Sequence, residues 1–387
     1  MAHIRLERTI WPVGHGAFYT EQFKDENGKV LFTAVYDCGS YQQTMLKRCI
    51  DEFQPRKGTL VIDALFISHF HFDHVNQLDY LFQKAYVKNL YIPQLSDDYV
   101  LSLLCTDTYG RNAPNSIVTL LQNLYNGLKI ENVENIYEVP QITEGNIPEG
   151  QYQPQEDINR RNHQIAPLAI QPYPFWMYMP CNIFAPCPQL KQELIQKGYS
   201  NNGTLDMNHV FADLQAGNWK QLQDIYGAVF RADHNEYSMT VYSGFSQNVV
   251  HKGIRSNLYL CAYPSSNPYG VYPYNGLIHE DLGCLYTGDF EAKKYALLLK
   301  QFYTQNQNAW GRTRMLQIPH HGSYKNYNQE LYDFPKLTYV SVALNDKNGH
   351  PDVQTLRDVA NKNCPIVIVQ DNKATTLIVD YCISLIP

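Results

Sequence analysis

Runs of apolar residues separated by polar turns divide the first part of the chain into strands and a helix. Residues 9–40 contain two β-rich runs, TIWPVGHGAFYTEQF and VLFTAVYDCGS, on either side of the polar turn KDENGK. The pair Asn27-Gly28 in that turn is a strong local signal for a hairpin. Apolar residues then recur at helical spacing over 41–53, which predicts a helix.

A continuous apolar segment comes next. The run LVIDALFIS, residues 60–68, is short and rich in branched side chains, as is typical of a buried strand. The sequence HFHFDH follows it directly. The pattern then predicts a helix over 75–84 and a strand at VKNLYIP.

The β pattern returns from residue 236 and continues to the end of the chain. EYSMTVYSG, NLYLCAYP, GCLYTGDF, MLQIPHHGS and TYVSVAL are predicted strands, with helices over 291–303 and 352–362. PIVIVQ and TTLIVDY are expected to close the chain as a hairpin. Strands dominate both ends, and each half finishes in helices. The predicted fold class is therefore α+β, a four-layer αβ/βα sandwich that forms one domain over residues 1–387.

Residues 96–230 form the part of the chain with the least regular pattern. SIVTLLQNLYNGL and QLKQELIQKGY are plausible helices, whereas residues 140–188 are rich in Pro, Gln, Asn and Tyr. We interpret 96–230 as an insertion or cap with long loops inside the domain.

Composition narrows the class of protein. Of the 387 residues 44% are hydrophobic and 18% charged, which favours a large core over disorder. The nine cysteines include no CxxC pair, so a zinc knuckle is not expected. We expect the cysteines to be reduced thiols. No signal peptide or apolar span is present, and we expect a cytoplasmic protein without membrane segments. The net charge of −6 is unfavourable for non-specific binding of long DNA. Bound metals would nevertheless make one cleft locally positive.

The strongest chemical signal is the segment His69-x-His71-x-Asp73-His74. Alternation along an extended segment places the first three of these side chains on one side, and His74 follows at the turn into a helix. Imidazole and carboxylate groups are ligands that suit zinc, iron or manganese. The alternative is a polar loop with chance histidines. Only 13 histidines occur in the chain, so three within six positions favour a metal site.

Further candidates follow later predicted strands. Asp289, in the turn TGD, is either a bridging carboxylate or a solvated turn residue. One of His320 and His321 is expected to be a ligand, and His320 is our choice. His350 either lines the cleft or is a loop histidine beside a proline. His234, just before a predicted strand, either completes a first metal site or faces water.

These motifs resemble the metallo-β-lactamase superfamily. HFHFDH is similar to its HxHxDH signature, and PVGHGAFYT followed by VYDCGS is similar to its opening hairpin. The resemblance implies that Asp37 lies beneath the metal histidines and accepts a hydrogen bond from one of them. It also implies that Asp289 bridges two metals. His234 falls where the family has a GHTxGS stretch.

IPHHGS, NGHP and the final hairpin resemble one branch, the hydrolase domain of bacterial DNA-uptake channel proteins. This resemblance covers roughly 9–95 and 230–387 and leaves the middle of the chain unexplained. It implies a metal-dependent hydrolase that uses a metal-bound hydroxide, with two divalent ions, zinc or manganese, or iron as the alternative. In the implied first metal site the ligands are His69, His71 and His234, and in the second they are Asp73, His74 and His320. Asp73 also orients the nucleophile. One further residue donates a hydrogen bond to the oxyanion or the leaving group, and the candidates are His350, His321, Ser323 and Lys325.

Three functions stay open at this point. The leading hypothesis is a phosphodiesterase or nuclease, which makes nucleic acid one class of partner. The second is a hydrolase of a small-molecule ester, thioester or lactam. The third is a non-catalytic metal-binding interaction module. The sequence does not indicate an oligomeric state.

Overall fold

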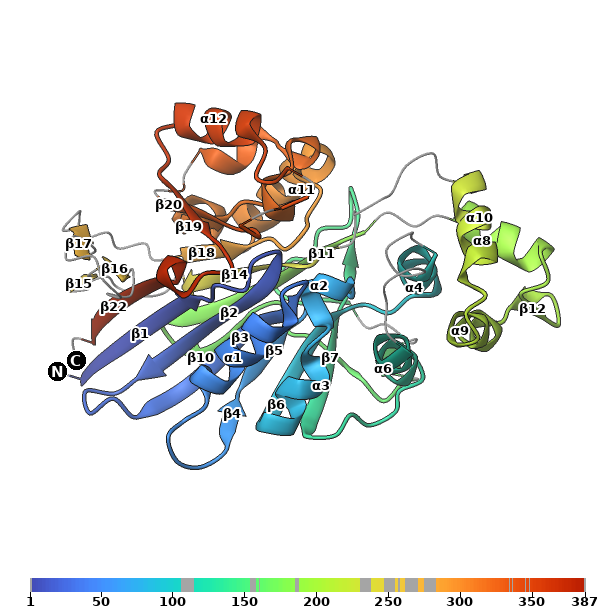
Figure 1. Cartoon of the computed structure of the whole chain (residues 1–387), viewed down its shortest axis with the longest axis horizontal. Helices are drawn as coiled ribbons and strands as arrows, with labels where there is room; N and C mark the ends of the chain where they lie inside the picture. The colour runs from blue at the N-terminus through green and yellow to red at the C-terminus, as the bar shows by residue number, and fades with distance from the viewer. Residues whose placement is uncertain are drawn as a thin grey trace.

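The architecture is a sandwich of two β-sheets with helices on the outside (Figure 1). The two chain termini lie close together at one end of the molecule. The computed structural model describes residues 2–105, 115–153, 158–159, 161–184, 188–229, 238–246, 255–256, 258–261, 271–274, 283–333, 335, 337–344, 346–347 and 349–385.

The first sheet is built mainly from the N-terminal part of the chain and is closed by the last strand. Its strands lie in the order β15 (Arg255–Ser256), β22 (Leu377–Leu385), β1 (Ala2–Ile10), β2 (Gly16–Lys24), β3 (Val30–Ser40), β5 (Ala64–Phe66), β6 (Ala85–Pro93), β7 (Val133–Val139) and β9 (Gln164–Ile165), and β4 (Leu60–Ile62) also pairs with β6.

The second sheet is built mainly from the C-terminal part. Its strands lie in the order β10 (Ile170–Tyr173), β11 (Trp176–Ile183), β14 (Thr240–Phe245), β18 (Gly283–Tyr286), β19 (Thr313–Gln317), β20 (Leu337–Ser341) and β21 (Ile366–Val369), with β8 (Gln141–Ile142) beside β11. Two small hairpins, β12 (Ser200–Asn201) with β13 (Thr204–Leu205) and β16 (Leu258–Cys261) with β17 (Val271–Tyr274), lie outside both sheets.

Helices cover the outer faces of the sandwich. Helices α1 and α3 lie against the first sheet, and α11 and α12 lie on the side of the second (Figure 1). The helices are α1 (Gln43–Phe53), α2 (Phe72–Val75), α3 (Leu78–Lys84), α4 (Asp97–Leu104), α6 (Asn115–Tyr125), α8 (Pro188–Gln196), α9 (Met207–Gln215), α10 (Trp219–Val229), α11 (Ala292–Gln305) and α12 (Val353–Asn361). No helix among the described residues has both the length and the apolar character needed to cross a membrane.

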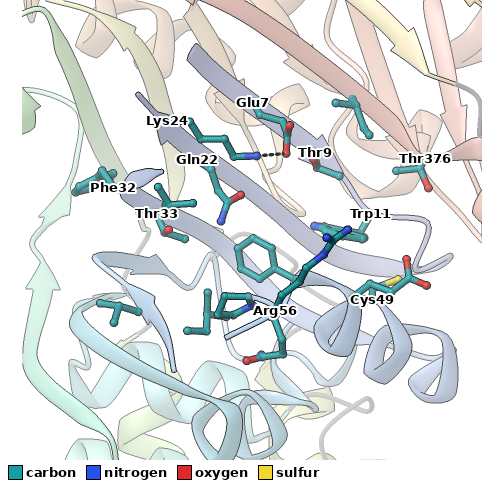
Figure 2. Close-up of a pocket in the computed structure, with 18 of the residues that line it drawn as sticks. Glu7, Thr9, Trp11, Gln22, Lys24, Phe32, Thr33, Cys49, Arg56 and Thr376 are labelled. Carbon is teal, nitrogen blue, oxygen red and sulfur yellow. Dashed lines mark hydrogen bonds and ion pairs between the residues drawn. The ribbon is translucent and has the colours of Figure 1, made fainter. Parts of the chain in front are cut away.

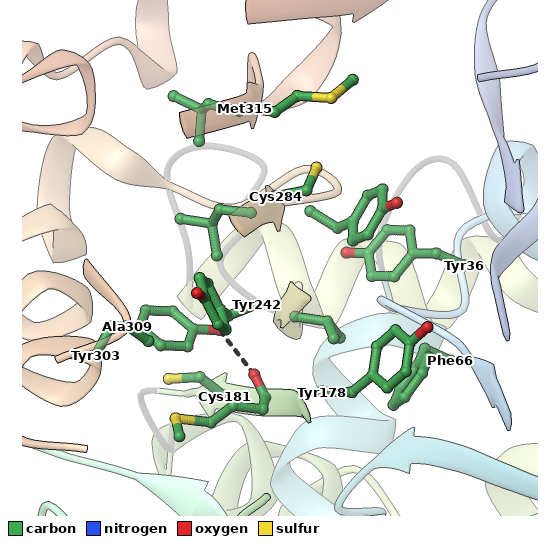
Figure 3. Packing of buried hydrophobic residues seen from close by; sticks show 14 of the residues in the cluster. Tyr36, Phe66, Tyr178, Cys181, Tyr242, Cys284, Tyr303, Ala309 and Met315 are labelled. Atoms are coloured by element: carbon green, nitrogen blue, oxygen red, sulfur yellow. Dashed lines mark hydrogen bonds between the residues drawn. The ribbon is translucent and has the colours of Figure 1, made fainter. Parts of the chain in front are cut away.

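Neighbouring residues of the first sheet point alternately into two apolar layers, as the pleat of a strand requires. Tyr36 and Phe66 belong to the core between the two sheets. Their neighbours Val35 and Leu65 belong to the layer beneath the outer helices. Tyrosines are prominent in the inner layer, where Tyr36, Phe66 and Tyr178 pack together (Figure 3). The four-layer αβ/βα sandwich predicted from the sequence is confirmed.

The predicted closing hairpin is wrong. β21 runs parallel to β20 at the edge of the second sheet, whereas β22 pairs antiparallel with β1 in the first. Both segments have apolar patterns that fit strands, but the six residues after Gln370 carry the chain from one sheet to the other instead of forming a tight turn. Local pattern does not distinguish these two connections.

The middle of the chain also differs from the interpretation as one insertion over 96–230. β7 lies within the first sheet and β11 within the second, so both are part of the sandwich. Helices α8, α9 and α10 stand to one side of it (Figure 1). Their apolar faces pack into the same layer as α4 and α6.

Candidate metal centre

The candidate ligands converge at one edge of the sandwich because the strands that precede them end there. Residues 69–74 follow β5, which runs parallel to β3. Asp289 follows β18, and His321 follows β19, which runs parallel to β18. Carboxyl ends of parallel strands meet at one edge of a sheet, so segments far apart in sequence meet there.

Glycines allow the backbone to close around this edge. Gly39 packs against α2, where an added Cβ atom would lie 2.3 Å from the carbonyl carbon of His74. Gly288 has a φ of +53°, and a Cβ there would lie 2.5 Å from the Oγ atom of Ser238. The glycines of the DCG and TGD motifs therefore serve close packing and turn geometry.

The first group of ligands consists of His69, His71 and Asp289, whose nearest ligand atoms all lie within 4.8 Å of one another. Nδ1 of His69 is hydrogen-bonded to the hydroxyls of Ser68 at 2.9 Å and Ser238 at 3.1 Å. Its Nε2 atom lies 3.8 Å from Oδ2 of Asp289. The serines fix the ring so that Nε2 faces the carboxylate.

His74 belongs to a second group, together with Asp289 and His321. Nδ1 of His74 lies 2.8 Å from Oδ2 of Asp37, and Nε2 lies 3.2 Å from Oδ1 of Asp289. A carboxylate only accepts hydrogen bonds, so Nδ1 of His74 carries the proton and donates to Asp37. Nε2 is then the atom of His74 that is available to a metal.

Asp37 is fully buried beneath these rings. It also accepts hydrogen bonds from the Ser68 backbone N–H at 2.7 Å and from the Ser68 hydroxyl at 2.6 Å. Its φ is +58°, a conformation that aspartate and asparagine tolerate better than most residues. Burial raises the pKa of Asp37, although its contact with His74 opposes the shift.

His321 lies against both carboxylates. Nδ1 of His321 donates to the carbonyl oxygen of Ser341 at 2.8 Å. Nε2 lies 3.3 Å from Oδ2 of Asp73 and 3.7 Å from Oδ1 of Asp289. His320, our choice of ligand, also acts on Asp289 and is the histidine that lowers the pKa of that carboxyl most, so this choice stays a prediction. Both histidines have positive φ. His320 is hydrogen-bonded to the side chain of Asn326.

The other predicted site residues lie around this cluster or outside the described residues. His350 is half-buried, with its ring centroid 6.1 Å from that of His320. Ser323 is buried in the same turn, where its N–H donates to the carbonyl of His320. Lys325 is exposed in the short helix that follows. The prediction for His234 falls outside the described residues.

Sequence reasoning missed His15. This buried residue lies between β1 and β2, with Nε2 3.5 Å from Oδ2 of Asp73. It forms a third ligand group with Asp73 and His321. A topological signal was available: β2 runs antiparallel to β3, so the start of β2 must lie beside the end of β3, where Asp37 is.

Charges in the centre are strongly coupled. Burial lowers the pKa of His71 to about 4, so this ring is neutral at pH 7. Burial would also lower the pKa of His74, but the carboxylates of Asp289, Asp73 and Asp37 together raise it above its usual value. The pKa of Asp289 is lowered, because the surrounding histidines outweigh its burial.

The donor atoms fit a divalent cation. Nε2 of His69, His71 and His74 and Oδ1 of Asp289 are all buried, and each lacks a hydrogen-bond partner among the described residues. Leaving one buried polar atom unsatisfied costs about 1–3 kcal/mol, so four such atoms aimed at one region require an explanation. A metal ion bound by these nitrogens and this oxygen would supply it.

A large hollow in the described structure lies away from this cluster. It has a volume of about 1460 Å³ and lies on the outer face of the first sheet, beside α1 (Figure 2). Glu7 and Lys24 form an ion pair across its floor, with Trp11 and Arg56 also in its lining. None of the metal-centre residues lines it, so we assign the chemistry to the His/Asp cluster and not to this hollow.

Comparison with family models supports the assignment of the HxHxDH segment to the metal centre. Residues 25–108, which include the HxHxDH segment, match a family model described as the metallo-β-lactamase superfamily. Among solved structures, the chain is similar to one described as the crystal structure of unliganded yeast PDE1, at 10% identity and a TM-score of 0.34, over 99% of this chain and 100% of that one. A likeness of that size bears no functional argument. A search of curated proteins finds no match.

Proposed function

We propose that this chain, which carries a metallo-β-lactamase superfamily domain, is a hydrolase with two divalent metal ions that cleaves phosphodiesters. The observation that carries the proposal is three overlapping groups of buried ligand side chains, which together contain His69, His71, His74 and two aspartates. Metal-dependent hydrolysis is the chemistry of the superfamily, and the phosphodiester is our extension of it.

The overlap of the ligand groups supports two ions. His69 and His71 form one group with Asp289, and His74 and His321 form another with the same carboxylate. Each carboxylate oxygen faces a different group: Oδ2 lies toward His69 and Oδ1 toward His74. Asp289 is thus suited to bridge the two ions. Zinc and manganese suit this ligand set, with iron as the alternative.

When bound, two such ions would lower the pKa of a water molecule toward 7 and polarise the bond to be cleaved. The chain itself contributes the orientation. Ser68, Asp37 and Ser341 hold the rings of His69, His74 and His321 with Nε2 toward the centre. Asp73 lies between the second group and His15, where its carboxylate can orient a nucleophile. His350, near His320 at the rim, is our candidate donor to a leaving group.

The phosphodiester is favoured for two reasons. Two metals about 3.5–4 Å apart can flank the attacking and leaving oxygens of an in-line displacement at phosphorus. In addition, the motifs IPHHGS and NGHP resemble those of the DNA-uptake branch. A small-molecule ester, thioester or lactam is the second candidate, because the same centre polarises a carbonyl oxygen equally well.

The test is a substrate panel. The purified chain, loaded with manganese or zinc, is assayed on bis-p-nitrophenyl phosphate, single-stranded DNA, cyclic nucleotides, a thioester and nitrocefin. We expect turnover of a phosphodiester that requires added metal and disappears with EDTA. Asp289→Asn should reduce kcat by a factor of about 100 or more, since it removes the bridging charge while preserving shape.

The control is Asp51→Asn, which changes an exposed carboxylate on α1. It should leave turnover within about twofold of the unmutated chain, because surface substitutions away from a site have small effects. Turnover of the thioester or nitrocefin alone would replace the phosphodiester with the second candidate. Bound metal without turnover of any substrate would favour a non-catalytic binding module.

A further inference from the structure

His15 lies at the metal centre although it comes from the turn between the first two strands, far from the HxHxDH segment. Its ring centroid is 3.7 Å from that of His321. Nε2 lies 3.5 Å from Oδ2 of Asp73, the same oxygen that lies 3.3 Å from Nε2 of His321. Three donor atoms from three separate segments therefore surround one small volume.

The protonation of His15 follows from its second nitrogen. Nδ1 lies 3.0 Å from Oδ1 of Asp346. A carboxylate accepts hydrogen bonds, so Nδ1 carries the proton and the neutral ring presents a lone pair at Nε2. That lone pair faces a carboxylate oxygen of Asp73. Two acceptors facing each other in a buried place repel unless a cation lies between them.

The same arrangement is found at the proposed ligands. Nδ1 of His74 donates to Asp37, and Nδ1 of His321 donates to the carbonyl of Ser341; in both, Nε2 faces the centre. Ligand histidines in metalloproteins commonly have this carboxylate or carbonyl partner, which fixes the tautomer. His15 with Asp346 repeats the pattern from an independent part of the chain.

The backbone of His15 is held rigidly for this role. Its N–H donates to Oε1 of Gln42 at 3.1 Å, and its carbonyl accepts from the Tyr41 N–H at 3.0 Å. Gly16 follows with a φ of +145°, where a Cβ atom would lie 2.3 Å from the carbonyl oxygen of Gly39. The glycine lets the loop approach β3 closely, and the hydrogen bonds fix the direction of the imidazole.

We propose that His15 is an additional ligand of the second metal ion, together with Asp73, His74, His321 and Asp289, and that Asp346 positions it. One nitrogen binds one ion, so Nε2 of His321 cannot serve two metals. The group that contains His15 and the group that contains His74 therefore share a single ion. This inference rests on the proposed function, because it adds a ligand to a centre that must first bind metal.

The test is metal affinity, not turnover. Zinc content of the full chain is measured by mass spectrometry, the affinity of each site by chelator competition, and the coordination by the visible spectrum of the Co²⁺ form. We expect His15→Ala to retain the first ion and to bind the second at least tenfold more weakly, with a changed Co²⁺ spectrum. Asp346→Asn should weaken the second ion by about 10- to 100-fold, as is usual for partners of ligand histidines.

A matched control is His209→Ala, which removes an exposed histidine on α9. It should bind both ions with unchanged affinity. Asp346→Asn keeps the test informative if His15→Ala does not fold, because it changes one hydrogen-bonding group and leaves the glycine-flanked loop intact. Two ions bound by His15→Ala and Asp346→Asn with unchanged affinity would overturn the inference and leave the proposed function standing. Absence of metal from the unmutated chain, under metal-replete conditions, would overturn the proposed function itself.

Discussion

Individual side chains in the centre are positioned by groups that do not face the metal. Asp37 receives three hydrogen bonds, two from Ser68 and one from His74. It is fully buried, so no water replaces these contacts. The orientation of His74, and through Ser68 that of His69, therefore depends on one carboxylate.

Asp37→Asn tests this dependence. Asparagine tolerates the positive φ at this position, so the backbone should be retained. The amide has one acceptor oxygen, so its NH2 group must face either the Ser68 backbone N–H or the Ser68 hydroxyl and His74. We expect the affinity for metal to fall by about 10- to 100-fold. Chelator competition measures it, with Asp51→Asn as the surface control. An unchanged affinity would show that Asp37 does not hold the ring.

At the residue scale, the HxHxDH spacing predicted that His69, His71 and Asp73 lie on one side of an extended segment. The structure groups His69 and His71 with Asp289, whereas Asp73 lies in the first turn of α2 and is grouped with His15 and His321. For the pair at 320–321, the structure places His321 against Asp73 and Asp289, and the choice of His320 stays a prediction. The sequence analysis missed His15, although the hairpin predicted over 9–40 already places the start of β2 beside the end of β3.

Packing between secondary-structure elements determines where the metal ligands lie. The helix α2, which carries Asp73 and His74, packs directly on β3 at Gly39. Gly39→Ala should push this helix outward, destabilise the chain by about 1–3 kcal/mol and lower its metal content. Denaturant unfolding and metal analysis measure the two effects. Gly227→Ala, which has open space around the added methyl, should be neutral or stabilising by up to about 1 kcal/mol.

A second junction between elements joins β7 to the segment before β9. The buried carboxylate of Glu138 accepts hydrogen bonds from Arg161, His163 and the Leu95 backbone N–H. Burial would raise the pKa of Glu138, but these contacts lower it below its usual value. A carboxyl group whose pKa is lower in the folded state stabilises the fold above its unfolded pKa. That stability is lost as the pH falls through the folded pKa.

Glu138→Gln should therefore destabilise the chain most at neutral pH. We expect a loss of about 3 kcal/mol or more at pH 7, as for one partner removed from a buried ion pair. The difference from the unmutated chain should shrink as the pH falls below the usual pKa of glutamate toward the lowered pKa of Glu138, where the folded carboxylate becomes protonated. Urea unfolding at several pH values measures it. A difference independent of pH would contradict an ionised Glu138.

The two halves of the molecule meet at the centre, so metal binding should stabilise the whole fold. His69 and His74 come from the first sheet, and Asp289 and His321 come from the second. An ion that binds only the folded chain stabilises it by about 2.7 kcal/mol at a free concentration 100 times its Kd. We expect zinc or manganese to raise the melting temperature by several degrees and EDTA to reverse the rise. His69→Ala should lose most of this shift.

At the scale of the molecule, the sandwich could be predicted from the sequence, but its chain connections could not. Alternating and continuous apolar runs indicated two sheets and outer helices, as found. β21 and β22 gave the pattern of a hairpin, yet they belong to different sheets. The sequence did not identify β7 and β11 as strands of the sandwich, because their pairing partners are distant in sequence. Such long-range pairing depends on the packed sandwich and leaves no local signal.

Anomalous X-ray diffraction at the zinc and manganese absorption edges, from crystals grown with each ion, tests the central claim most directly. The account predicts two peaks on either side of the Asp289 carboxylate, with Nε2 of His69 and His71 about 2.0–2.1 Å from one and Nε2 of His74 and His321 at similar distances from the other. Crystals with the ion present in excess and no peak between these side chains would contradict it.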